Sequence, residues 1–184
     1  MLMVFSNFNG VWKAGANISN IGPKMKYEDA GQENFIPTNF KVGTGFDFIF
    51  DIENRLGAYV EFNKLLVPTP RDFNDEYNDI GAIEGIFTSW GDAPGGFGEE
   101  LREVTWALGA EYMYREAFAF RAGYFSESLT KGSRRFASFG AGFKYEQVNI
   151  DISYLFSTSP VPSPLEGTLR FGLTFNFGGQ FPVY

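Results

Sequence analysis

Apolar and polar residues alternate without interruption along Thr168–Gly178, near the C-terminal end of the sequence. Leu169, Phe171, Leu173 and the two following phenylalanines share one face of a predicted strand, and polar or small residues share the other. Strict alternation over this length predicts a β-strand whose two faces meet different surroundings. About ten such residues is also the length that a tilted strand needs to cross a bilayer.

The same alternation recurs along the rest of the chain, and it predicts about eight strands in all. The seven further strands are expected at Val11–Ser19, Phe40–Phe50, Leu56–Asn63, Val104–Tyr114, Phe118–Phe125, Ala137–Tyr145 and Val148–Phe156. Short turns at 51–55, 115–117 and 146–147 alternate with long loops at 21–36, 67–100, 126–134 and 157–167. Short turns on one side and long loops on the other are typical of outer-membrane barrels.

The longest break between predicted strands, Val67–Glu100, is expected to be an extracellular loop that carries a short helix. Apolar residues recur there at helical spacing, which predicts an amphipathic helix over Asn78–Trp90, and Asp92–Gly98 is expected to be loop. Long loops usually carry function, and an apolar stripe outside a membrane needs a cover, either the barrel mouth or a partner. The candidate partner-binding residues are Phe73, Tyr77, Ile80, Ile83, Phe87, Trp90 and Phe97.

Composition favours a membrane barrel over a soluble sandwich or lipocalin, which alternate in the same way. The 184 residues include 22 Phe and 22 Gly, yet the mean hydropathy is only −0.15 and no apolar run is long enough for a membrane-spanning helix. The apolar faces carry almost no charge in mid-strand, as lipid requires. Aromatic residues gather at the strand ends in two belts, one at Trp12, Tyr112, Tyr114, Tyr145 and Phe177 and one at Trp106, Tyr124, Tyr154 and Phe156.

The chemistry-bearing residues do not assemble a catalytic site. The chain has no His and no Cys, its net charge is −7, and no basic tract is present, so an enzyme, a thiolate metal site and a nucleic-acid partner are not expected. Glu111 and Arg121 should lie opposite each other in the lumen, either as a selectivity element or as a simple ion pair. The spacing of Asp92, Glu99 and Glu100 fits no standard calcium loop, so these are expected to be solvated, with no metal and no cofactor bound.

Eight segments give the chain a resemblance to a known family, the PorV family of the type IX secretion system, which belongs to the FadL-like barrels. The segments are Gly15–Lys24, Asn34–Gly43, Glu61–Pro70, Asp92–Leu101, Thr105–Tyr114, Phe120–Ser128, Ser153–Ser159 and Pro164–Gly178. The resemblance implies an all-β, transmembrane antiparallel barrel of fourteen strands in the outer membrane. The eight strands here would be its C-terminal half, with residues 1–184 forming one domain and the upstream strands and signal peptide absent.

The resemblance also implies a function. Such a protein receives the folded C-terminal signal domain of secreted clients at an SprA-like translocon and passes the client to a surface attachment complex. It would have no reaction of its own and would lie among outer-membrane lipid and lipopolysaccharide; the family's association with lipopolysaccharide deacylation finds no residues here to support it. A FadL-like channel for small hydrophobic molecules is the alternative. The two differ in where specificity lies: in outer loops for a carrier, in a lumen pocket for a channel.

Overall fold

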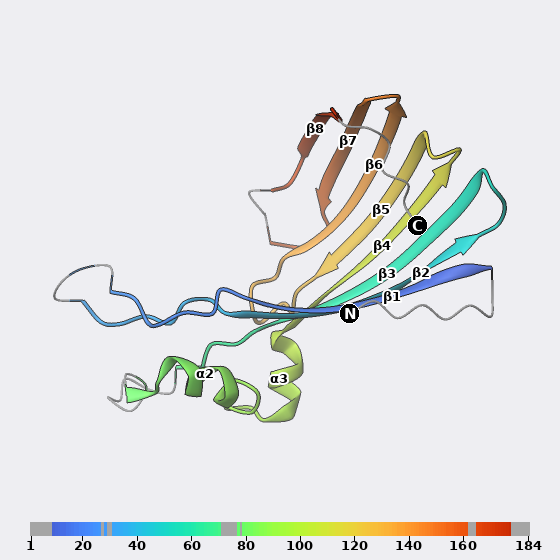
Figure 1. Cartoon of the computed structure of the whole chain (residues 1–184). Helices are drawn as coiled ribbons and strands as arrows, with labels where there is room; N and C mark the ends of the chain where they lie inside the picture. The colour runs from blue at the N-terminus through green and yellow to red at the C-terminus, as the bar shows by residue number, and fades with distance from the viewer. Residues whose placement is uncertain are drawn as a thin grey trace.

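The computed structural model describes residues 9–26, 28, 31–70, 77, 79–161 and 165–177, and in these residues it forms one antiparallel sheet of eight strands (Figure 1). Each strand pairs with its sequence neighbours in the order β1 to β8, so the wall is a simple meander. The strands are β1 Gly10–Ser19, β2 Asn39–Ile49, β3 Asn54–Leu65, β4 Val104–Tyr114, β5 Phe118–Ser126, β6 Arg135–Tyr145, β7 Val148–Ser157 and β8 Thr168–Phe175. All eight predicted strands are present, which confirms the all-β prediction; β8 ends at Phe175, earlier than expected.

The pairing register joins the apolar face of every strand into one continuous surface, which we call the apolar face. One row across the sheet contains only apolar side chains, one from each strand: Trp12, Phe46, Ala58, Ala110, Ala122, Phe139, Tyr154 and Leu169. A register slip of one residue on any strand would turn its apolar set to the other side. The alternation in the sequence therefore disfavours every register that is shifted by an odd number of residues.

Large side chains on the apolar face remain exposed. Phe120 and Phe139 are each 57% exposed and Phe171 is 68% exposed. The buried apolar residues of the described chain are few: Leu66, Ala93, Ala119 and Phe136. A continuous exposed apolar surface of this extent needs an apolar environment outside the chain, as the wall of a membrane barrel has.

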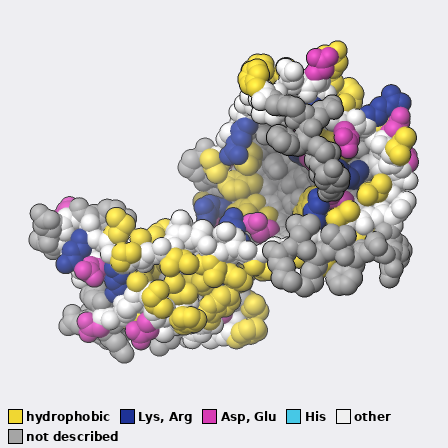
Figure 2. Space-filling view, viewed as in Figure 1, with side chains coloured by type: hydrophobic (Ala, Val, Ile, Leu, Met, Phe, Trp, Pro, Cys, Tyr) yellow, Lys and Arg dark blue, Asp and Glu magenta, His cyan; other side chains and the backbone are white. Residues whose placement is uncertain are grey.

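The opposite side of the sheet, which we call the polar face, carries glycine and charged residues. The row beside the apolar one contains Asp47, Gly57, Glu111, Arg121, Gly140, Ser153 and Arg170. The sheet is curved (Figure 1), and acidic and basic side chains gather around its hollow (Figure 2).

The sheet is open, with β1 and β8 as its two edges. In the part of the chain that is described, no helix is long and apolar enough to cross a membrane.

The segment between β3 and β4 contains helix α2, Ala82–Thr88, and helix α3, Phe97–Glu103. Helix α2 falls inside the predicted span but is shorter, since Glu84 accepts a hydrogen bond from the Gly81 N–H and so marks its first turn. Helix α3 was not predicted. Gly96, with φ of 69°, allows the sharp turn before it, and Glu99 and Glu100 favour its N-terminal turn. Phe97 and Gly98, expected in a loop, are therefore helical.

Candidate functional site

The described residues between β3 and β4, namely 66–70, 77 and 79–103, form a distinct substructure that we call the cap. In Figure 1 it lies at the end of the sheet where the long β1–β2 connection also projects, away from the short turns. The long loop predicted from the sequence is therefore a folded element. Its position depends on a set of charged side chains.

A buried lysine joins the cap to the wall. Lys64, near the end of β3, pairs in register with Phe40 and Val104, so it belongs to the apolar face. Its Nζ donates to Oε2 of Glu100 at 2.7 Å and to Oε2 of Glu103 at 2.8 Å, and the side chain is only 4% exposed. Helix α3 therefore covers the apolar face at the rim of the sheet.

A second lysine ties α3 to the connection between β5 and β6. Lys131 Nζ donates to Oε1 of Glu99 at 2.7 Å and to Oε1 of Glu103 at 3.1 Å. Glu103 thus accepts from Lys64 through one oxygen and from Lys131 through the other. Because these partners are far apart in the sequence, the contacts fix α3 between two separate parts of the rim.

Acidic side chains also hold the glycine-rich stretch before α3. Oδ2 of Asp92 accepts from the Thr69 N–H at 2.7 Å, Oε1 of Glu100 from the Ala93 N–H at 2.9 Å, and Oε2 of Glu99 from the Gly95 N–H at 2.7 Å. Asp92 and Glu100 are buried, so the expectation that they are solvated is wrong. The pattern missed this because the partners that bury them are distant in sequence.

Carboxylate oxygens of Asp92, Glu100 and Glu103 lie within 4.8 Å of one another. The lysine and backbone donors already described account for this cluster as part of the cap's own hydrogen bonding. Burial raises the pKa of Glu100, but the hydrogen bonds from Lys64 and from the Ala93 N–H outweigh it and hold the pKa below its ordinary value. The pKa of Glu99 is lowered by its hydrogen bond from Lys131. Both groups therefore favour the ionised state.

Helix α2 packs onto the connection between β1 and β2. Gly85 and Ser89 are buried, and a side chain at position 85 would meet the Phe35 ring at 2.7 Å and Pro68 at 3.0 Å. Tyr77 packs edge-on against Phe35, with ring centroids 5.5 Å apart, and Trp90 packs against Phe40 at 5.6 Å. The helix therefore faces the protein with its small residues.

The larger apolar residues of the cap point outward. Ile83 is 61% exposed, Phe87 72% and Phe97 79%, and Figure 2 shows hydrophobic side chains gathered over this region. Trp90 is half exposed, and Ile80 is partly buried. Phe73 lies outside the described residues. Leu101, 57% exposed and one helical turn after Phe97, was missed because the sequence pattern predicted no helix here.

On the polar face, Glu111 and Arg121 lie opposite each other. Arg121 donates through Nε to Oε2 of Glu111 at 2.6 Å, and through Nη1 to Oδ1 of Asp151 at 2.5 Å. Asp151 was not singled out from the sequence, although it pairs with Gly142 across the predicted 146–147 turn. A Cβ at Gly142 would lie 2.7 Å from that Asp151 oxygen, so glycine leaves room for the bond to pass over β6.

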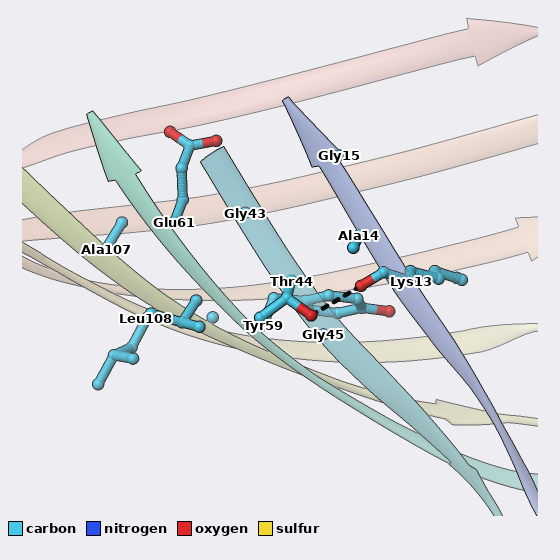
Figure 3. A pocket seen from close by; sticks show the side chains of 12 residues that line it. Lys13, Ala14, Gly15, Gly43, Thr44, Gly45, Tyr59, Glu61, Ala107 and Leu108 are labelled. Carbon is cyan, nitrogen blue, oxygen red and sulfur yellow. Dashed lines mark hydrogen bonds between the residues drawn. The ribbon is translucent and has the colours of Figure 1, made fainter. Parts of the chain in front are cut away.

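A second network spans β1 to β3 beside an open hollow of about 390 Å³ (Figure 3). Lys13 Nζ pairs with Oδ2 of Asp47 at 2.7 Å, and the Tyr59 hydroxyl donates to the other oxygen of Asp47. Lys41 pairs with Glu61 at 3.3 Å. The hollow is lined by glycine, by small and apolar residues such as Ala14, Val60 and Leu108, and by Lys13 and Glu61, whose charges are paired.

Comparison with known proteins finds a match to a family model. Residues 2–72 match the family model described as type IX secretion system protein PorV. The resemblance inferred from the sequence is confirmed over this part of the chain, and it supports a role in type IX secretion and protein transport. No curated protein matches the chain.

Proposed function

We propose that this chain is the part of a type IX secretion protein that binds secreted clients, and that the cap is its binding surface. In this proposal it lies in the outer membrane, with lipid against the apolar face. It receives the folded C-terminal signal domain of a client at an SprA-like translocon and passes the client to the surface attachment complex. The family match over residues 2–72 supports the secretion role.

The observation that carries the proposal is an exposed apolar surface on a rigidly held helix. Phe97 and Leu101, one turn apart on α3, are 79% and 57% exposed, while Glu100 and Glu103 anchor the other side of the helix to Lys64. A surface that is already ordered loses little conformational entropy when a partner binds. Exposed aromatic residues on such a surface are the residue type that dominates binding energy at protein interfaces.

The polar face offers less for the alternative of a channel for small hydrophobic molecules. Pockets for such ligands enclose most of the ligand's surface. The hollow on the polar face is open, and the two charged residues that border it, Lys13 and Glu61, are paired. An open hollow holds a small ligand poorly, which favours the carrier. Among the sequence-based candidates, Phe97 remains a proposed client contact, whereas the contact of Tyr77 with Phe35 favours a structural role.

The test is the double variant Phe97→Asp, Leu101→Asp in the full-length protein within its native secretion system. Replacing the whole stretch 92–98 by a linker is less informative, because Asp92, Ala93 and Gly95 hold the cap together. Capture of the client's C-terminal domain should fall at least tenfold, with client release and surface attachment falling in parallel. The barrel itself should remain heat-modifiable, since no strand is changed.

Leu129→Asp is the matched control, because Leu129 is 50% exposed but lies in the β5–β6 connection outside the cap. It should capture clients normally. Normal capture by the double variant would exclude α3 and direct attention to the other long connections, 21–36 and 157–167.

A further inference from the structure

Two bulky apolar residues of helix α2, Ile83 and Phe87, face away from the protein, and Trp90 follows just after the end of the helix. Ile83, Phe87 and Trp90 follow one another at positions i, i+4 and i+7, and they are 61%, 72% and 51% exposed. Gly85 and Ser89, on the opposite side, are buried against the rest of the chain. We call the three exposed residues the α2 stripe. A stripe of this kind requires an apolar environment supplied from outside.

The α2 stripe continues the apolar face of the wall. Trp90 packs on Phe40, and Phe40 pairs in register with Ile18 on β1, also on the apolar face. Lys64, on the other side of Phe40, is the residue that α3 covers. The cap therefore projects from the same side of the sheet that carries the apolar rows. We therefore expect the same surroundings to cover both the apolar face at this rim and the α2 stripe.

The level of the stripe along the strands fits the membrane boundary. Phe40 and Phe48 are the first and last apolar-face residues of β2. Eight residues rise about 26 Å along a strand, or about 20 Å along the membrane normal at a tilt near 40°, which nearly fills the apolar band of about 25 Å that barrels expose. Phe40 and the Trp90 ring beside it then lie at the edge of that band, where tryptophan is favoured.

We propose that the α2 stripe lies in the interfacial layer of the outer leaflet, so that α2 is an interfacial membrane anchor for the cap. The proposal rests on the membrane location given under the proposed function. Lipid is favoured over a protein as the occupant because three side chains form a patch of several hundred Å² at most. A stable protein interface buries about 1,200 Å² or more, whereas attachment to a bilayer surface grows with the apolar area buried, so a small patch also contributes. The anchor would leave Phe97 and Leu101 of α3 for the client.

The experiment uses single cysteines as sites for a spin label, in a cysteine-free background that these 184 residues already provide. The folded protein is isolated from outer membranes and reconstituted into vesicles of phosphatidylcholine and phosphatidylglycerol. Collision of the label with oxygen, which concentrates in lipid, is compared with collision with a water-soluble nickel chelate. The test sites are Ile83→Cys and Phe87→Cys, and the controls on the same helix are Glu84→Cys and Thr88→Cys.

Labels at 83 and 87 should collide with oxygen at least threefold more, relative to the chelate, than labels at 84 and 88. Phe139→Cys, in the middle of the apolar face, and Leu129→Cys, in a polar connection, give the lipid and water limits. A water-like result at both test sites overturns the anchor. Shielding from both reagents overturns it in favour of a protein contact. A water-like result at Phe139 shows instead that the membrane location itself has failed, and the anchor with it.

Discussion

The wall and the cap use charge in opposite ways. On the polar face of the wall most of the ion pairs are open to solvent: the side chains of Lys41 and Glu61 are 45% and 49% exposed, and the buried exception is Asp47, paired with Lys13, at 6%. In the cap the side chains of Lys64 and Glu100 are 4% and 9% exposed. Exposed pairs contribute little to stability, whereas a buried charge left without its partner is costly. The wall can therefore lose an exposed charge such as that of Lys41 with little effect, whereas the cap cannot lose the charge of Lys64.

This difference follows from what holds each region together. The wall is held by backbone hydrogen bonds between neighbouring strands, and its side chains need only fall on the correct face. The cap has little regular structure, and its position depends on Lys64 and Lys131, which contact the same helix from two sides. If the proposed function is correct, the wall supplies the rigid frame and the cap the recognition surface.

The largest expected effect is that of Lys64→Ala. Removing the ammonium leaves Glu100 and Glu103 near each other without their shared donor, which costs about 3–5 kcal/mol for a buried pair. The cap should detach while the strands remain paired, so limited proteolysis should cut between β3 and β4. Lys41→Ala, the matched control in the wall, should cost less than about 1 kcal/mol. Equal protection of the cap in both variants would contradict the comparison.

The next effect concerns the wall alone. Phe171, in the middle of β8 and 68% exposed on the apolar face, is expected to face lipid. Phe171→Arg should cost about 2–4 kcal/mol if the position lies near the membrane midplane. Thr174→Arg, on the polar face, should be milder. The measurement is the fraction of heat-modifiable barrel in membranes, and a more damaging Thr174→Arg would mean that the two faces are inverted.

The sequence predicted the wall better than the cap for a physical reason. Alternation is a local property, and it placed Phe46, Leu108 and Phe171 on the correct face without knowledge of any partner. The cap depends on non-local contacts, such as the bond between Lys64 and Glu100, which are 36 positions apart. No local pattern shows that such a lysine will be covered. For the same reason the sequence predicted no helix over Phe97–Glu103, and Leu101 was overlooked.

A smaller effect should follow from acid. The pKa of Glu100 is lowered from its ordinary value of 4.5, so its contribution to stability is fully present above that pH and is lost as the pH falls through the lowered value. The cap should therefore loosen below pH 4.5, before the wall does. Trp90 reports this as a red shift of fluorescence when Trp12 and Trp106 are replaced by Phe. In the Glu100→Gln variant the acid-induced red shift should be smaller. A cap that loosens as the pH rises from 4.5 towards neutrality would contradict the prediction.

The smallest expected effect is that of Arg121→Gln on the polar face. Arg121 bonds both Glu111 and Asp151, but its side chain is 44% exposed, so the loss of each pair should cost only about 0.2–1 kcal/mol. The midpoint of heat modification should shift by a few degrees at most. A loss as large as that of Lys64→Ala would mean that the wall also depends on its charges, and the contrast with the cap would disappear.

The same variant tests whether the pair of Glu111 and Arg121 is a selectivity element. The measurement is the reversal potential of the protein in a planar bilayer under a salt gradient. If the pair selects ions, Arg121→Gln should change the reversal potential; if the pair only neutralises two charges, the reversal potential should stay unchanged.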